Sequence, residues 1–437
     1  MRDLKYDEIY MNLMSKTWIK DISGLFDYCS KDSLSFNSSI YDSMNIIRKG
    51  QEIKQDALEE KEIDNIEHLF YIKKENEKYV IENNVDINME QNEKNINKIN
   101  NNFWFVIHNK NKKYFLLKND IIKLGRIKYF ISEESIYSGD KKYELSVPNI
   151  ESVSKINKQN ERIGNPFNLI TEYKTIFDKD NTPKEKGLCK ICYSEEIEPL
   201  KNPMVHLCNC KGYINYAHFN CIKYWMKTKL IIRENEKKTV KTYFIPQFNC
   251  EICKVAYPYK FKLDKNGEQI YELIDIERPN CKYIILESLN QIKENNENHK
   301  FIHVIKLINE EDITIGRSNK ADLKISDISV SRIHAKLKFN FDSKSLEISD
   351  LNSKFGTLVL IKDKIELKSG ERLITQVGRT LFGVNVIKKE EEKIKEEKNN
   401  SLDEEDKLSK ENINNNKEMK INNINVDKYK TEEKSNQ

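Results

Sequence analysis

The pattern of apolar and polar residues divides the chain into regions of different character. From about residue 103 to 131, short apolar runs alternate with turns rich in Asn and Lys, which is typical of β-strands. A longer stretch of the same kind runs from about Tyr283 to Ile387. Inside it, alternate positions are apolar and would face one side of a strand: Ile333, Ala335, Leu337 and Phe339. The pattern predicts a chain whose main folded part is β-structure.

The other regions are patterned more weakly. Residues 1–100 alternate short apolar stretches with charged, Asn-rich segments, and we expect a weakly structured N-terminal region. Residues 136–184 are expected to be a linker, because Pro148 and Pro166 interrupt a polar stretch. The tail over 389–437 is mixed in charge and has nothing to bury, so we expect it to be disordered or a marginal single helix.

Two segments far apart in the sequence resemble each other. Leu117-Lys118 … Leu124-Gly125-Arg126 is similar to Leu367-Lys368 … Val377-Gly378-Arg379, although the spacing differs by three residues. The similarity indicates either that residues 101–135 are a degenerate copy of the downstream β domain, or simply that the chain has two similar hairpins.

Composition narrows the classes of protein. The chain has 437 residues, enough for two or three domains, of which 38% are hydrophobic and 33% charged. The net charge of 74 − 70 = +4 is too balanced to indicate nucleic-acid binding. No apolar run reaches the roughly 18 residues that span a bilayer, and the N-terminus lacks an apolar signal sequence. We expect a soluble intracellular protein with no membrane partner, in the cytoplasm or the nucleus.

Eight residues have the spacing of metal ligands. They read C-x2-C, x15, C-x-C, x7, H-x2-C, x28, C-x2-C, and they are Cys189, Cys192, Cys208, Cys210, His218, Cys221, Cys250 and Cys253. Four pairs of thiolate and imidazole ligands in this order can hold two tetrahedral Zn²⁺ ions. The chain has nine cysteines, and we expect the other two, Cys29 and Cys281, to be ordinary thiols.

The array over 185–262 resembles the RING-CH zinc finger, the C4HC3 variant of the RING. The resemblance implies a small cross-braced α+β module in which the ligand pairs interleave. One site would be Cys189, Cys192, His218 and Cys221, and the other would be Cys208, Cys210, Cys250 and Cys253. His206 competes by position, but we expect it to be structural because Cys208 and Cys210 already complete their pair. The gap of 28 residues before Cys250 is slightly long for the family, and its charged middle over 233–238 is expected to be a surface insertion.

The plant homeodomain finger is an alternative, since it is also C4HC3 and reads histone tails. Phe248 lies two residues before the seventh ligand, where that family has an aromatic residue. Its spacing from the third to the fifth ligand is shorter than the C-x-C-x7-H of this chain, so we favour the RING-CH fold.

RING domains act without a nucleophile, so no catalytic residue is expected. They hold a ubiquitin-charged conjugating enzyme (E2) so that its thioester is positioned to react. The resemblance implies contacts to the E2 from Ile191 and Trp225, and a brace on ubiquitin from Lys254, although Lys lacks the fork of Arg. Either apolar residue could instead belong to the core.

A second resemblance covers 280–388, where the ordered motifs are Ile315-Gly316-Arg317, Ser331-Arg332-Ile333-His334 and Asn352-Ser353-Lys354-Phe355-Gly356-Thr357. They resemble the forkhead-associated (FHA) domain, an all-β sandwich that binds phosphothreonine. The resemblance implies phosphate contacts from Arg317, Ser331 and Lys354. It implies that His334, Gly356 and Thr357 brace the loops. Phe355 replaces the Asn that commonly precedes Gly-Thr, which puts the peptide preference in doubt.

Together the two resemblances predict a multidomain chain in which a RING-CH module is followed by an FHA sandwich. The function they imply is that of an E3 ubiquitin ligase recruited to a phosphothreonine-containing protein. The alternative is a zinc-binding phosphopeptide adaptor without transfer activity.

Overall fold

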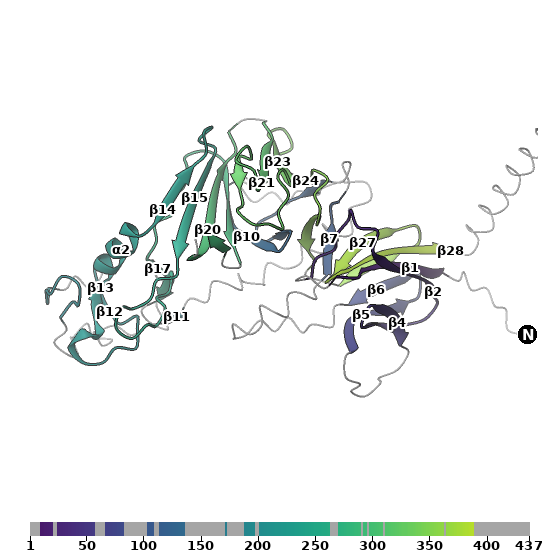
Figure 1. The fold of residues 1–437 in the computed structure, drawn as a ribbon, viewed down its shortest axis with the longest axis horizontal. Coiled ribbons are helices and arrows are strands. Elements are labelled where there is room, and N and C mark those ends of the chain that lie inside the picture. The colour runs from purple at the N-terminus through teal and green to yellow at the C-terminus, as the bar shows by residue number, and fades with distance from the viewer. Residues whose placement is uncertain are drawn as a thin grey trace, which may run out of the picture.

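The computed structural model describes residues 9–20, 24–56, 66–82, 103–108, 113–135, 171–172, 188–196, 201–262, 270–289, 292–294, 297–308, 311–361 and 364–388. Within them the protein is mostly β-structure, as predicted, and has one α-helix, α2 (Phe219–Thr228). The helix lies at one end of an elongated molecule and strands β1–β6 lie at the other (Figure 1). The tail expected at 389–437 lies outside the described residues, as does the expected linker except for β11 (Thr171–Glu172).

The N-terminal region differs from the weak structure expected of it. Its described residues form six strands: β1 (Ile9–Trp18), β2 (Ser33–Ile40), β3 (Met44–Lys49), β4 (Glu52–Asp56), β5 (Ile66–Glu75) and β6 (Lys78–Glu82). Along β1, the alternate residues Ile9, Met11 and Leu13 are buried, as the pleat of a strand requires. The strand that pairs with β1, β28 (Thr380–Lys388), lies near the other end of the sequence, so no local pattern could reveal the pairing.

The strand-like block before residue 135 has the expected strands. They are β7 (Phe103–Val106), β8 (Lys113–Phe115), β9 (Ile121–Leu124) and β10 (Ile127–Glu134). The downstream β region forms β18 (Tyr283–Ser288), β19 (Ile292–Glu294), β20 (Glu297–Lys306), β21 (Ile313–Gly316), β22 (Leu323–Lys324), β23 (Ala335–Asn340), β24 (Ser345–Asp350), β25 (Thr357–Leu360), β26 (Ile365–Lys368), β27 (Arg372–Val377) and β28.

Strands from the two ends of the chain are exchanged between two halves of similar topology. Two five-stranded sheets have the orders β4-β3-β5-β6-β26 and β22-β21-β23-β24-β8. In the first, the C-terminal strand β26 completes an N-terminal sheet, and in the second the N-terminal strand β8 completes a C-terminal sheet. The large sheet repeats this exchange, because hairpin β9–β10 lies between β25 and β18 while hairpin β27–β28 lies between β7 and β1.

The exchanged hairpins are the two segments whose sequences resemble each other. Leu124 pairs with Ile127 in one hairpin and Val377 pairs with Thr380 in the other, so each turn consists of Gly-Arg. Gly125 and Gly378 have φ angles of 60° and 55°, in the left-handed region where a side chain is disfavoured. The similar sequences therefore correspond to hairpins in equivalent places.

A single apolar core joins both halves. It contains buried residues from the N-terminal strands, such as Leu13 and Phe70, together with residues of the downstream region, such as Leu337 and Phe382. Aromatic rings from distant strands are in contact within this core. The ring centroid of Phe70 lies 4.8 Å from that of Phe103 and 5.0 Å from that of Phe382. The halves are therefore packed together through their interiors.

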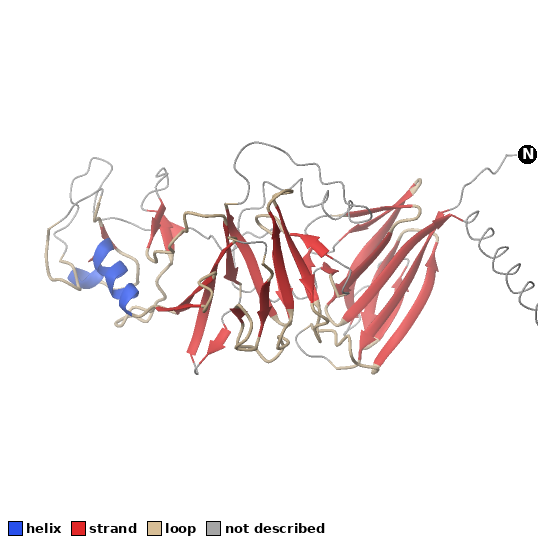
Figure 2. Cartoon of the chain, turned by 90° about the horizontal axis from the view of Figure 1, so that it is seen from above, coloured by secondary structure: helices blue, strands red, loops and turns tan. Residues whose placement is uncertain are grey.

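The long gap in the cysteine array forms a hairpin that joins the zinc region to the large sheet. Strand β14 (Ile231–Glu234) pairs with β15 (Val240–Pro246), and β15 pairs along its whole length with β20. The charged turn between them is largely exposed, as expected of an insertion. Figure 2 shows the helix at the end of the row of strands. Backbone hydrogen bonds thus connect the two modules.

Candidate metal centres and phosphate-binding site

Short elements place the Cys and His side chains of the zinc region. Strand β12 (Met204–Val205) pairs with β13 (Ala217–His218), and α2 begins directly after His218. The helix buries Phe219, Ile222 and Met226, which follow the three- and four-residue spacing of one helical face. This face packs inward and leaves Cys221 in the first turn.

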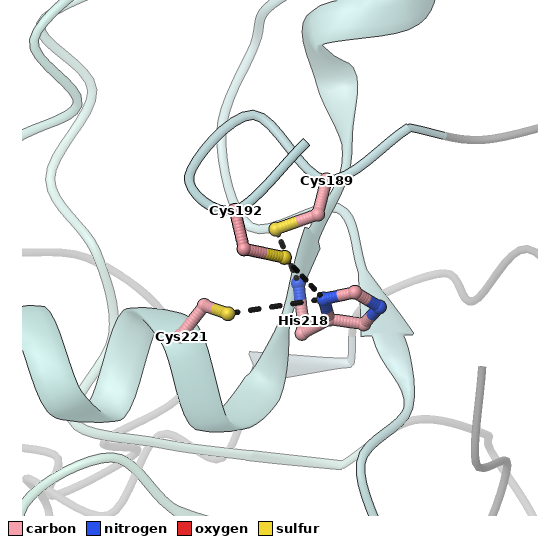
Figure 3. Close-up of side chains that lie close together, drawn as sticks. All are labelled: Cys189, Cys192, His218 and Cys221. Carbon is pink, nitrogen blue, oxygen red and sulfur yellow. Dashed lines mark hydrogen bonds between the residues drawn. The ribbon is translucent and has the colours of Figure 1, made fainter. Parts of the chain in front are cut away.

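The structure brings the first predicted set of ligands together. The ligand atoms of Cys189, Cys192, His218 and Cys221 all lie within 4.8 Å of one another. Nδ1 of His218 is 3.3 Å from Sγ of Cys192 and 3.8 Å from Sγ of Cys221 (Figure 3). The other ring nitrogen, Nε2, is 2.5 Å from the backbone oxygen of Glu196. A proton on Nε2 donated to that carbonyl leaves Nδ1 as a free lone pair facing the sulfurs, as a metal site needs.

The second predicted set also converges. The sulfur atoms of its four cysteines lie within 4.8 Å of one another, and those of Cys210 and Cys250 are 3.6 Å apart. The side chain of Lys190 reaches into this cluster, with Nζ 3.3 Å from Sγ of Cys208 and 3.7 Å from Sγ of Cys250. Lys190 lies between the first two ligands of the other cluster, so it links the two sets.

The chemistry of the donors fits Zn²⁺. One cluster offers three thiols and an imidazole, and the other offers four thiols, which are the usual ligand sets of tetrahedral structural zinc. Burial and the neighbouring Cys208 raise the pKa of Cys210. Burial opposes ionisation of Cys250 too, but backbone N–H groups of Cys253 and Ile252 lower its pKa. Because the thiols crowd one another, a divalent cation is what would favour the thiolate form at all four positions.

Three other His and Cys residues considered in the sequence lie outside both clusters. His206 belongs to neither cluster and its ring lies 5.7 Å from that of Tyr216, which agrees with a structural role. Cys29 and Cys281 also lie outside both clusters.

The residues proposed to meet the E2 differ in exposure. Ile191 is 40% exposed, but Trp225 is half-buried against Phe248 and Tyr257, with ring centroids 5.7 and 6.0 Å apart. Lys254 is exposed and donates from Nζ to the backbone oxygen of Glu251 over 2.8 Å. Trp225 therefore packs partly against the apolar core of the zinc region, as the second role that sequence reasoning allowed would require.

In the downstream domain, Arg317 and Ser331 lie together where strand β21 ends. The backbone N–H of Arg317 donates to the oxygen of Ser331 over 2.9 Å, and its guanidinium Nε donates to Val330 over 3.2 Å. Gly316 allows this approach, because a Cβ there would lie 2.2 Å from the backbone oxygen of Arg332. The hydroxyl of Ser331 accepts from the backbone N–H of Lys354 over 3.0 Å, so its own proton remains available to a phosphate.

His334 connects the two loops that carry these residues. It is fully buried, accepts from the backbone N–H of Ser331 at Nδ1 over 3.1 Å, and its Nε2 lies 3.1 Å from the oxygen of Gly356. Burial lowers its pKa, which favours the neutral ring that this pattern needs. Thr357 donates to the buried carboxylate of Asp350 over 2.7 Å. This geometry is what bracing of the loops requires.

The N-terminal region contacts the loop around Lys354, which sequence reasoning did not foresee. Nζ of Lys354 is 3.2 Å from Oδ2 of Asp27, and the backbone N–H of Tyr28 donates to the oxygen of Lys354 over 3.0 Å. Phe355 packs against Trp18, with ring centroids 6.1 Å apart. Phe355 therefore has a packing role at the junction of the two halves, which explains an aromatic residue at this position.

Arg126 supports the other loop from the exchanged hairpin. The guanidinium nitrogens Nε and Nη2 each lie 2.8 Å from Oδ2 of Asp327, and the backbone N–H of Arg126 donates to Oγ of Ser329 over 2.9 Å. Asp327 and Ser329 precede Ser331 in the loop that shapes the phosphate site. The Gly125-Arg126 repeat was the signal in the sequence that could have pointed to this contact.

Comparisons with known proteins agree with both resemblances. The family model of the RING-variant domain matches residues 189–253, and that of the FHA domain matches residues 313–375. The chain is 30% identical over 118 residues to the ERAD-associated E3 ubiquitin-protein ligase DOA10 of Saccharomyces cerevisiae, covering 27% of this chain and 8% of that protein. It is 32% identical over 97 residues to the probable E3 ubiquitin-protein ligase MARCHF10 of Rattus norvegicus, covering 22% of this chain and 11% of that protein.

These comparisons confirm a RING-variant domain and an FHA domain in the chain, and the clusters support zinc binding. The chain spans only about a tenth of the length of these curated relatives. Among the described helices, none combines the length and the apolar character needed to cross a membrane.

Proposed function

We propose that this protein is an E3 ubiquitin-protein ligase of the RING-CH type. The observation that carries the proposal is the position of two Cys/His clusters within the part of the chain matched by the RING-variant model. The relatives that match are named as ubiquitin ligases, which supports the same activity. Each cluster would hold one Zn²⁺ ion, and the two ions would stabilise a module with a small apolar core.

In the proposed reaction this chain supplies position, not a nucleophile. It would bind a ubiquitin-charged E2 and restrict the thioester to geometries that an incoming lysine amine can attack. Ile191 is the apolar contact with the best support, because it is exposed beside the first ligand pair. Ile252 is 58% exposed between the last two ligands and would add a contact of the same kind. Trp225 would act mainly by supporting this surface, and Lys254 would brace ubiquitin.

We further propose that the FHA domain binds phosphothreonine in a partner protein. Arg317 would pair with the phosphate, Ser331 would donate a hydrogen bond to it, and Lys354 would approach after releasing Asp27. The support is the contact between the loops of Arg317 and Ser331 and the free hydroxyl proton of Ser331. Binding would raise the concentration of a phosphorylated partner near the charged E2.

The exchange of strands also supports a proposal about the domains. We propose that residues 101–135 are FHA-like, with β8 and the hairpin β9–β10 completing the downstream sandwich. Strands β1–β6 would form a second, degenerate sandwich that β26 and the hairpin β27–β28 complete in exchange. The matching order of the two five-stranded sheets and the equivalent Gly-Arg hairpins support this reading.

Autoubiquitination tests the ligase proposal. The full chain, loaded with zinc, is incubated with ubiquitin, activating enzyme, ATP and a panel of E2 enzymes. Ile191→Ala should lower transfer while zinc stays bound, and Ile308→Ala is a matched control, since Ile308 is 51% exposed but lies outside the zinc region. An absence of transfer with every E2, with the zinc sites filled, would favour the adaptor. The packing of the half-buried Trp225 against Phe248 and Tyr257 supports that alternative, because it reduces the apolar surface offered to an E2.

A further inference from the structure

The hairpin inserted in the zinc region extends one sheet of the FHA sandwich past the edge of the other. Strands β15 and β14 continue the sheet beyond β20 (Figure 1). The opposite sheet stops at β22, which pairs only with β21 among the described strands. The space left beside β22 is a cavity of about 500 Å³, which we call the trough.

The trough has walls from both modules. The zinc-region hairpin contributes Arg233, Thr242 and Phe244, and the FHA domain contributes Thr314, Ala321 and Lys324. One side of the trough is therefore the face of the extended sheet. The other side is the edge strand β22, whose outer side pairs with no described strand, the position where an added strand would bind.

The trough lies beside the phosphate site. Strand β22 runs parallel to β21, and Lys324 is the partner of Gly316, the residue before Arg317. Asn319 and Lys320, which follow Arg317 closely in the chain, also line the trough. An extended peptide whose phosphate is held at Arg317 could therefore continue along β22 under the hairpin.

The charges in the trough favour an acidic ligand. Three lining carboxylates already form ion pairs with lysines: Glu234 with Lys306, Asp312 with Lys336, and Asp322 with Lys237. Of the lining acids, Glu236 alone has no ion pair among the described residues. Lys320 and Lys324 are both exposed, and neither forms an ion pair within the described part of the chain. Two lysines and one acid that line the trough therefore have no ion-pair partner among the described residues. The excess positive charge would attract an acidic side chain.

We propose that the trough binds the segment that flanks the phosphothreonine, in extended form, and favours acidic residues in it. The inference rests on the proposed phosphothreonine binding and adds a substrate preference to it. It also gives the long insertion between Cys221 and Cys250 a role, because β14 and β15 then take part in reading the partner protein. The zinc region would contact the same peptide that the FHA domain anchors.

Peptide binding to the full chain tests the inference. Fluorescence polarisation compares phosphothreonine peptides that carry Glu or Ala at each flanking position, together with their unphosphorylated forms. We expect Glu on one side to tighten binding about two- to fivefold, the size of exposed ion pairs. Lys324→Glu should abolish or invert this preference while phosphorylation is still required. Lys338→Glu is the matched control, because Lys338 is exposed on β23 but does not line the trough.

Hydrogen exchange provides a second, independent measurement. The full phosphopeptide should slow amide exchange in β14 and β15, and a peptide cut next to the phosphothreonine should not. Equal binding of Glu and Ala peptides, or an unchanged preference in Lys324→Glu, would refute the trough while leaving phosphothreonine binding intact. Equal binding of phosphorylated and unphosphorylated peptides would refute the proposed FHA function, and the trough with it.

Discussion

Replacement of Arg126 by alanine tests whether the N-terminal half shapes the phosphate site. Arg126 lies far outside the residues matched by the FHA model, yet it contacts Asp327 and Ser329 in the loop that leads to Ser331. Burial raises the pKa of Asp327, but hydrogen bonds from Ser329 and Arg126 outweigh burial and lower it. Removing the guanidinium would leave one oxygen of a buried carboxylate without its partner.

The size of the effect follows from this geometry. A hydrogen bond to a charged group contributes about 1.5–3 kcal/mol. The side chain of Arg126 is 51% exposed, so solvent screening reduces the expected loss to about 1–2 kcal/mol. If these roughly 1–2 kcal/mol stabilise the loop conformation that binds the phosphate, phosphopeptide affinity drops about 5- to 30-fold in Arg126→Ala, since 1.4 kcal/mol corresponds to a factor of ten. The backbone hydrogen bond from Arg126 to Ser329 remains, which limits the loss.

The assay is titration of a labelled phosphothreonine peptide with Arg126→Ala, Arg126→Lys and Arg379→Ala. Arg379 occupies the equivalent turn in the other hairpin, where its side chain donates to the backbone oxygens of Gly50 and Ile19 over 2.7 and 3.4 Å. Within the described residues, its side chain makes no hydrogen bond or ion pair with the phosphate loop. Its loss should change thermal stability by a similar amount and leave affinity unchanged. Arg126→Lys should recover part of the affinity through its charge. If both alanine variants bind equally well, the loop does not depend on the hairpin and the reasoning fails.

Three other changes have expected outcomes. Removal of zinc by a chelator should release two ions per chain and unfold the region over 188–262, as metal analysis and circular dichroism would show, and a stoichiometry other than two would contradict the paired sites. Gly316→Ala should destabilise the FHA domain by about 1–3 kcal/mol in urea unfolding, because its Cβ would lie 2.2 Å from the oxygen of Arg332. His303 is fully buried, and burial lowers its pKa to about 3. An unfolded His binds a proton below about pH 6.5, so its contribution to stability is present above that pH and is lost as the pH falls toward 3. The free energy of unfolding should be lower by about 2 kcal/mol at pH 5 because of this residue. Urea unfolding at several pH values should show a smaller decrease in His303→Gln.

The sequence predicted the parts of the site that depend on spacing. The spacing of the cysteine array indicated metal ligands, the RING-CH resemblance implied two interleaved sets, and the structure brings the same residues together. Gly316, Ser331 and His334 could be recognised because they stand in the ordered motifs that resemble the FHA domain. These features are local or lie on short loops, so the sequence displays them directly.

The contacts that sequence reasoning missed all depend on strands exchanged over long distances. Strand β1 pairs with β28, which lies at the other end of the described chain, so the pairing has no local signal. Asp27 and Tyr28 reach the Lys354 loop only because β1 and β27–β28 form one sheet. Phe355 was read as a departure from the FHA pattern, whereas its contact with Trp18 makes it part of the junction. The local pattern of apolar and polar residues carries no information about which distant strand a given strand will pair with.

Sheet hydrogen bonds join the zinc region to the large sheet, and the opposite sheet, which carries the phosphate site, packs on the large sheet through the shared core. Strand β15 leaves the zinc region and pairs with β20, and His303 on β20 contacts Thr242 on β15 and Tyr129 on β10, at 2.9 and 3.3 Å. A flexible tether would let a bound partner sample many positions around the E2, whereas a paired and packed sheet holds its orientation. In the proposed ligase the set of lysines that can be modified would therefore depend on their distance and direction from the phosphothreonine. A partner whose lysines lie on the wrong side of that residue would bind well and still be a poor substrate.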